Sequence, residues 1–186
     1  MRIRTLFVLA VSTAMVAVFP SSAFASAPEW TEEGSPITES QTLVLRGPFQ
    51  TLKSSIGSYQ CETVDIEATV EPGPGAKGEI TSFTAQPGTC WGTGFMAGCK
   101  VTESAAEGKL SATAQGIELK EFVFVYEYEG CSVPQTIAGG DLSVQPIGGT
   151  EPIEELGISG TLHFESGGPF EVAGTFEVVE PTIGIS

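Results

Sequence analysis

The sequence contains no asparagine, one histidine and two aspartates, and each shortage excludes a kind of site. Without asparagine there is no Asn-x-Ser/Thr acceptor for N-glycosylation. With Asp65 and Asp141 as the only aspartates, the acidic loops that usually bind calcium are also missing. The single histidine, His163, excludes histidine-rich zinc sites. We therefore expect neither a metal ion nor a cofactor.

Basic residues are also few. Eight lysines and arginines stand against 23 aspartates and glutamates, so the net charge of the 186 residues is −15. A chain this acidic repels phosphate groups, and nucleic acids and anionic membranes are therefore not expected partners. An excess of carboxylates is typical of a protein that stays soluble outside the cell.

Residues 1–25 have the features of a secretory signal peptide. Arg2 and Arg4 form a basic start, an apolar run follows from Leu6 to Phe19, and residues 23–25, Ala-Phe-Ala, fit the small-x-small cleavage pattern. The apolar run has about 14 residues, whereas a membrane-spanning helix needs about 20. Residues 26–186 carry six basic and 23 acidic residues, a net charge of −17, and end without an apolar tail. We expect a secreted protein without a membrane anchor.

Apolar residues after the signal peptide alternate with a period of two, as in strands that bury one face. In residues 61–71 one face carries Val64, Ile66, Ala68 and Val70. Residues 71–78, EPGPGAKG, predict a loop. Residues 116–130 predict a central strand covered on both sides, because residues 122–126 are apolar on both faces.

These patterns predict an all-β fold. We count about eight to ten strands with Gly/Pro-rich turns and no helix, which indicates an antiparallel β-sandwich or barrel. Residues 26–40 lack periodicity and predict a loose N-terminal arm. Residues 41–186 then form a single all-β domain.

The last two strands predict a C-terminal hairpin. Opposed residues of an antiparallel pair share a face, so only an even residue sum sets apolar against apolar. We place Phe164 opposite Phe170, which puts His163 opposite Glu171 on the outer face. The turn is then the three-residue loop 166–168, Ser-Gly-Gly.

Four cysteines follow the signal peptide: Cys61, Cys90, Cys99 and Cys131. An even number in an exported chain predicts two disulfides, with three possible pairings. Metal binding and redox chemistry need close pairs such as Cys-x-x-Cys, which the chain lacks. We favour Cys90–Cys99, which would close the connection between two strands, together with Cys61–Cys131. The other two pairings remain open.

The stretch 88–100, GTCWGTGFMAGCK, carries the candidate binding residues Trp91, Phe95 and Met96. If Trp91 and Phe95 are exposed, they can stack on a sugar ring or dock on a partner protein, as Trp30 also can. The alternative is that they fold back and cover one end of the domain.

The sequence gives little support for catalytic residues. His163 would have to serve as the base of any Ser-His-acid triad, yet no Gly-x-Ser-x-Gly elbow is present. Glu121 precedes the apolar run of residues 122–126, where partial burial would raise its pKa. The simpler interpretation is that both are ordinary surface residues of strands, and we expect no enzyme.

The chain resembles a loose group of exported bacterial proteins of unknown function. The resemblance lies in the order of a signal peptide, YQC (Tyr59–Cys61), SFTAQPGTC (Ser82–Cys90), GCKVT (Gly98–Thr102), GIEL (Gly116–Leu119) and EGCSV (Glu129–Val133). It covers about residues 57–135 and, more faintly, the final hairpin. It implies an all-β exported domain and no particular activity.

Together these features predict a secreted, non-catalytic binding or structural domain. Its ligand is expected to be a carbohydrate, a cell-wall polymer or a protein. The alternatives are a secreted hydrolase-type enzyme and an inhibitor of a secreted enzyme.

Overall fold

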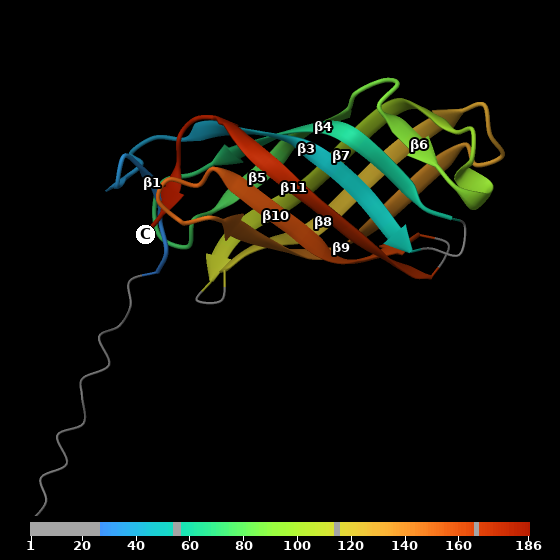
Figure 1. Ribbon diagram of the computed structural model, residues 1–186. Helices are drawn as coiled ribbons and strands as arrows, with labels where there is room; N and C mark the ends of the chain where they lie inside the picture. Colours follow the sequence, from blue (N-terminus) through green and yellow to red (C-terminus); the bar gives the residue numbers. More distant parts are fainter. Residues whose placement is uncertain (1–26, 54–56, 114–115, 166–167) are drawn as a thin grey trace, which may run out of the picture.

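The computed structural model describes residues 27–53, 57–113, 116–165 and 168–186. The predicted signal peptide, residues 1–25, lies outside the described residues. Long antiparallel strands form a barrel (Figure 1). They are β3 (Gln41–Lys53), β4 (Tyr59–Val70), β5 (Gly78–Ala85), β7 (Lys100–Thr113), β8 (Gly116–Glu129), β9 (Gln135–Ile147), β10 (Glu155–Phe164) and β11 (Pro169–Glu180).

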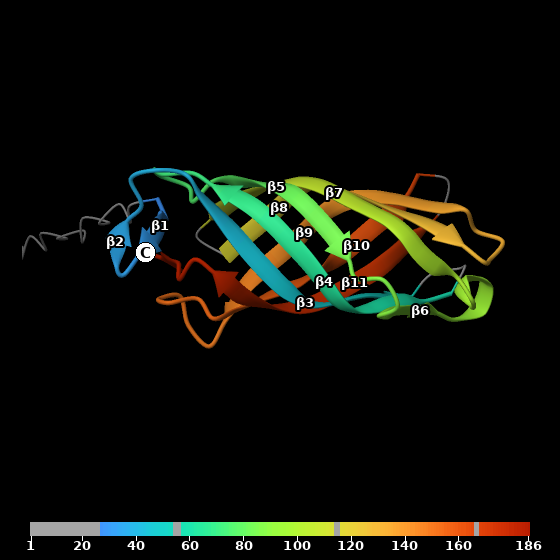
Figure 2. The same ribbon diagram turned by 90° about the horizontal axis from the view of Figure 1, so that it is seen from above.

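Each long strand pairs with the next long strand along the chain, and β11 pairs back with β3 to close the barrel. The strands cross the barrel wall diagonally (Figure 2). The pairing of β5 with β7 is short: Gly78 lies opposite Leu110 and Glu79 opposite Lys109. Further along this seam, the Ser104 hydroxyl accepts a hydrogen bond from the Ala85 N–H at 2.8 Å. The prediction of an antiparallel all-β fold is confirmed, in its barrel form.

The barrel interior is filled with side chains, as an eight-stranded barrel requires. The four apolar residues predicted on one face of residues 61–71 are all buried. Aromatic rings from different strands meet edge to face at the centre, with Phe49 5.5 Å from Phe83 and 5.7 Å from Phe124 between ring centroids. The alternation seen in the sequence therefore follows from a single inner face.

Strand β8 differs from its prediction. Phe122, Phe124 and Tyr126 point into the core, but Val123 and Val125 are half-buried on the outside of the wall. A barrel has one layer, so no second layer covers β8 as a central strand would require. Its outer valines reflect the preference of strands for β-branched residues.

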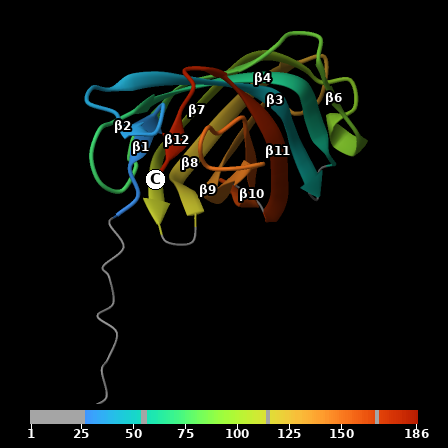
Figure 3. The same cartoon turned by 60° about the vertical axis from the view of Figure 1, so that its left-hand side comes forward.

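One end of the barrel is closed by a small sheet of β1 (Trp30–Glu32), β2 (Ser35–Pro36) and β12 (Gly184–Ile185) (Figure 3). Trp30 is 1% exposed, and its indole N–H donates to the carbonyl of Lys77 at 2.8 Å. This differs from the loose arm expected over residues 26–40. Strands of two or three residues are too short to show periodicity, so the sequence pattern misses them.

Next to Trp30 the barrel holds an apolar cavity of about 20 Å³, lined by side chains such as Leu43 and Leu156. This volume is about that of one water molecule, and an apolar lining offers water no hydrogen bonds. The cavity is far too small for an organic ligand. The side chains that fill the interior therefore stabilise the fold.

The C-terminal hairpin forms, but its register is shifted by two residues from the prediction. Leu162 lies opposite Phe170, and His163 opposite Pro169 instead of Glu171. The parity is right, because the same side chains still face the core. Phe164 and Phe170 do meet, but as stacked diagonal neighbours with centroids 4.3 Å apart. The connection is thus longer than the predicted turn 166–168, of which residues 166 and 167 lie outside the described residues.

Candidate functional site

The disulfides are Cys61–Cys90 and Cys99–Cys131, so the favoured pairing of Cys90 with Cys99 and Cys61 with Cys131 is wrong. The short strand β6 (Cys90–Gly92) pairs with the start of β4 and places Cys90 directly opposite Cys61. Cys99 precedes β7 and Cys131 follows β8, where the register opposes Lys100 and Glu129. Strand register, and not closeness in sequence, therefore brings the sulfurs together.

The segment between Cys90 and Cys99 is held at both ends: Cys90 is bonded to Cys61 on β4, and Cys99 to Cys131 just after β8. The 3₁₀ turn η1 (Gly94–Met96) follows β6 within it. The Thr93 N–H donates to the Ser58 carbonyl at 2.8 Å, which adds an anchor in the middle. We name residues 90–99 the clamped loop. Its two disulfides and this hydrogen bond hold both of its ends and its middle against the barrel.

The clamped loop displays two of its three candidate residues. Trp91 is 43% exposed and Phe95 is 71% exposed, whereas Met96 is 2% exposed. A Cβ at Gly92 would lie 2.6 Å from the Met96 Cβ, so glycine at this position lets Met96 pack inward. Met96 thus anchors the loop, while Trp91 and Phe95 form its outer surface. Trp30 is buried and cannot join them.

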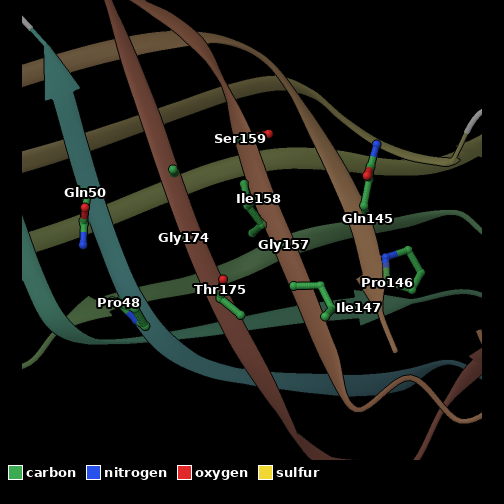
Figure 4. A pocket seen from close by; sticks show the side chains of 11 residues that line it. Pro48, Gln50, Gln145, Pro146, Ile147, Gly157, Ile158, Ser159, Gly174 and Thr175 are labelled. Carbon is green, nitrogen blue, oxygen red and sulfur yellow. The ribbon is translucent and has the colours of Figure 1, made fainter. Parts of the chain in front are cut away.

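A shallow groove of about 420 Å³ lies on the outer wall over β3, β11, β10 and β9 (Figure 4). Gln50 on β3 and Gln145 on β9 stand on opposite sides of it (Figure 4). Small residues, Gly157 and Ala173 among them, form the floor between the two glutamines. None of the described residues that line the groove is charged.

Strand register connects the groove to the clamped loop. Trp91 lies opposite Gln60, Gln60 opposite Gln50, and Gln50 opposite Ala173. Ala173 in turn lies opposite Ser159. We name these five residues, on β6, β4, β3, β11 and β10, the neutral row. Opposed residues of a sheet share a face, and this face is the outer one, because none of the five is fully buried.

The glutamines of this surface were missed in the sequence. The sequence offers only a weak signal for them, because Gln60 shares the outward face of β4 with the uncharged Thr63 and Thr69 as well as with Glu62, Asp65 and Glu67. Linking it to Gln50 and Trp91 required the register of three strands, which the sequence pattern does not supply.

The candidate catalytic residues lie apart from each other and from this surface. His163 on β10 is exposed and faces Gly139 on β9 and Pro169 on β11. Glu121 on β8 is exposed and forms an ion pair with Lys109 on β7, which lies on the side of β8 away from β10. The two side chains are therefore not brought together as a catalytic pair.

Glu121 also has an unusual backbone. Its φ is +53°, at an irregularity in the pairing of β8 with β9, and its N–H donates to Asp141 at 3.0 Å. This hydrogen bond is the first cause of a lowered pKa at the Asp141 carboxyl, with Lys120 as the next. The strained residue is thus explained by a strand irregularity that Asp141 stabilises.

Among the described residues, no group of three or more histidine, cysteine, aspartate or glutamate side chains is placed to hold a metal ion. No helix in the same part of the chain combines the length and apolar character needed to cross a bilayer. Comparison with known proteins finds no matching family model, no matching curated protein and no matching solved structure.

Proposed function

We propose that the protein is a secreted, non-catalytic binding domain that recognises its ligand through Trp91 and Phe95. The observation that carries this proposal is the exposure of two aromatic side chains on a loop with a disulfide at each end. Burying exposed aromatic rings is a main source of binding energy at recognition surfaces. A preformed loop loses little conformational entropy on binding, so more of that energy appears as affinity.

Export is supported by two independent features. The first 25 residues have the pattern of a signal peptide, and all four cysteines are paired. Disulfides persist in oxidising environments such as the cell exterior. Because side chains fill the interior of the barrel, we propose that the outer surface binds the ligand.

The experiment is a binding screen of the chain from residue 26 onward. The panel contains soluble neutral polysaccharides, polygalacturonate as an anionic polymer, and insoluble cell walls. Trp91→Ala and Phe95→Ala are compared with Val179→Ala, a matched control because Val179 is an exposed apolar residue (44%) outside the clamped loop. We expect the aromatic variants to bind at least about tenfold more weakly and the control to bind like the wild type.

The alternative enzyme hypothesis is tested in the same screen. His163→Ala and Glu121→Ala are expected to bind as tightly as the wild type. The proposal is refuted if nothing in the panel binds, or if a ligand binds all variants equally. A polysaccharide of the panel that the wild type degrades, and that His163→Ala or Glu121→Ala leaves intact, would replace the proposal with the hydrolase hypothesis.

A further inference from the structure

We infer that the ligand is an uncharged sugar chain that lies along the neutral row, from Trp91 across Gln60 and Gln50 into the groove. This inference rests on the proposed function and adds to it the chemical class of the ligand and a second contact region. Its starting point is that the exposed tryptophan and the groove share one row of the sheet. They are thus parts of one surface.

The geometry suits an extended ligand. Strands β4, β3, β11 and β10 lie side by side on one face of the barrel (Figure 1). Neighbouring strands are about 4.8 Å apart, so the row measures about 19 Å from β6 to β10. A ligand that contacts Trp91 and the groove at the same time must therefore be a chain of several units.

The groove has the size of a ligand site. Its volume of about 420 Å³ falls within the range of about 300–1,000 Å³ typical of small-molecule sites. The hollow exists because the floor lacks large side chains. The outward-facing floor residues Gly157 and Ala173 carry at most a methyl group. Gly174 faces the core instead, where a Cβ would collide with the carbonyl of Pro48 and the ring of Phe176.

Charge selects the ligand class. The five residues of the neutral row carry no charge, although the protein has 23 acidic residues. Thr175, Gly157 and Gln145, opposed in the next row across the groove, are uncharged too. A protein with this acidic excess repels anionic polymers, and an uncharged surface offers a cationic ligand no partner.

The available hydrogen-bonding groups fit sugar hydroxyls. Each hydroxyl both donates and accepts, and so does each glutamine amide. Gln60, Gln50 and Gln145 provide three amides, and Ser159 adds a hydroxyl. Trp91 adds a ring on which the apolar face of a sugar can stack. Aromatic ring and amides together are the chemistry that recognises a neutral carbohydrate.

The test is native electrophoresis in gels that contain hydroxyethylcellulose, mannan or soluble starch, with polygalacturonate as the charged comparison. Gln50→Ala and Gln145→Ala remove one amide each from the groove. Gln135→Ala is the matched control, because Gln135 is exposed at the start of β9, outside the neutral row and the groove. All three positions are on the outer wall, and thermal unfolding checks that each variant folds.

We expect at least one neutral polysaccharide to retard the wild type and the Gln135 control equally. Gln50→Ala and Gln145→Ala should each weaken binding by about threefold to tenfold, as the loss of one hydrogen bond does, and Trp91→Ala should weaken it further. If Trp91→Ala abolishes binding while both groove variants bind normally, the groove inference is wrong and the proposed function stands. If only polygalacturonate retards the protein, or if no gel retards it, the inference is overturned.

Discussion

Replacing Trp30 by alanine should strongly destabilise the protein, because Trp30 closes one end of the barrel. The side chain is 1% exposed. A buried tryptophan removes about 200 Å² from water, which at about 25 cal/mol/Å² corresponds to about 5 kcal/mol. Measured Trp→Ala losses of about 3–5 kcal/mol agree with this figure. The Lys77 carbonyl also loses one of its two hydrogen bonds and keeps the one from the Glu71 N–H at 2.9 Å.

The assay is urea or thermal unfolding followed by circular dichroism. For a domain of this size, about 4 kcal/mol lowers the melting temperature by about 10–15 °C. Trp91→Ala is the matched control, since the protein has two tryptophans and Trp91 is 43% exposed. It should cost less than about 1 kcal/mol. Trp30→Phe keeps an aromatic ring but loses the N–H donor. Its loss of stability should lie between those of Trp30→Ala and Trp91→Ala.

A loss of unfolding free energy in Trp30→Ala no larger than that in Trp91→Ala would contradict this prediction. That result would mean that residues 30–37 form a loose arm after all. Fluorescence gives an independent check: with Trp91→Phe, the remaining Trp30 should resist quenching by acrylamide. With Trp30→Phe, the remaining Trp91 should be quenched readily.

Three further predictions concern the disulfides, the tyrosines and a glycine. Cyanogen bromide cleavage after Met96 should give two fragments that separate under denaturing, non-reducing conditions. Each disulfide lies within one of these fragments. With either of the other two cysteine pairings, disulfides would hold the fragments together. Burial raises the pKa of all three tyrosines. Their contribution to the free energy of unfolding should therefore be fully present below pH 10 and fall above it, where the tyrosines of the unfolded chain ionise. Absorbance at 295 nm should therefore rise only as the protein unfolds, and a rise before unfolding would refute the burial. Gly47→Ala should destabilise by more than about 1 kcal/mol, since its Cβ would collide with the Thr175 carbonyl, while Gly149→Ala, in open space, should have little effect in chemical unfolding.

The strands could be predicted from the sequence because a barrel wall has one buried face, which imposes a period of two on apolar residues. The parity of the C-terminal hairpin followed from the same rule. Its register did not, because two phenylalanines can meet either directly across or diagonally, and Phe164 and Phe170 take the diagonal arrangement.

The candidate site was predicted in part. Trp91 and Phe95 were identified as binding candidates, and they are exposed. The disulfide pairing and the neutral row could not be predicted, since both depend on which residues of different strands are opposed. That information comes from the lengths of several turns and from strand irregularities, such as the shift between Gly47 and Phe49. Local sequence patterns do not contain it.

The pairing of the first long strand with the last has a consequence for when the protein can fold. Most neighbours in the barrel are adjacent in sequence, so local hairpins can form early. Closure between β3 and β11, and the pairing of Trp30 with Ile185, join opposite ends of the chain. Neither contact can form until the final residues are available. A chain that emerges gradually from a ribosome therefore keeps an open barrel until β11 has emerged.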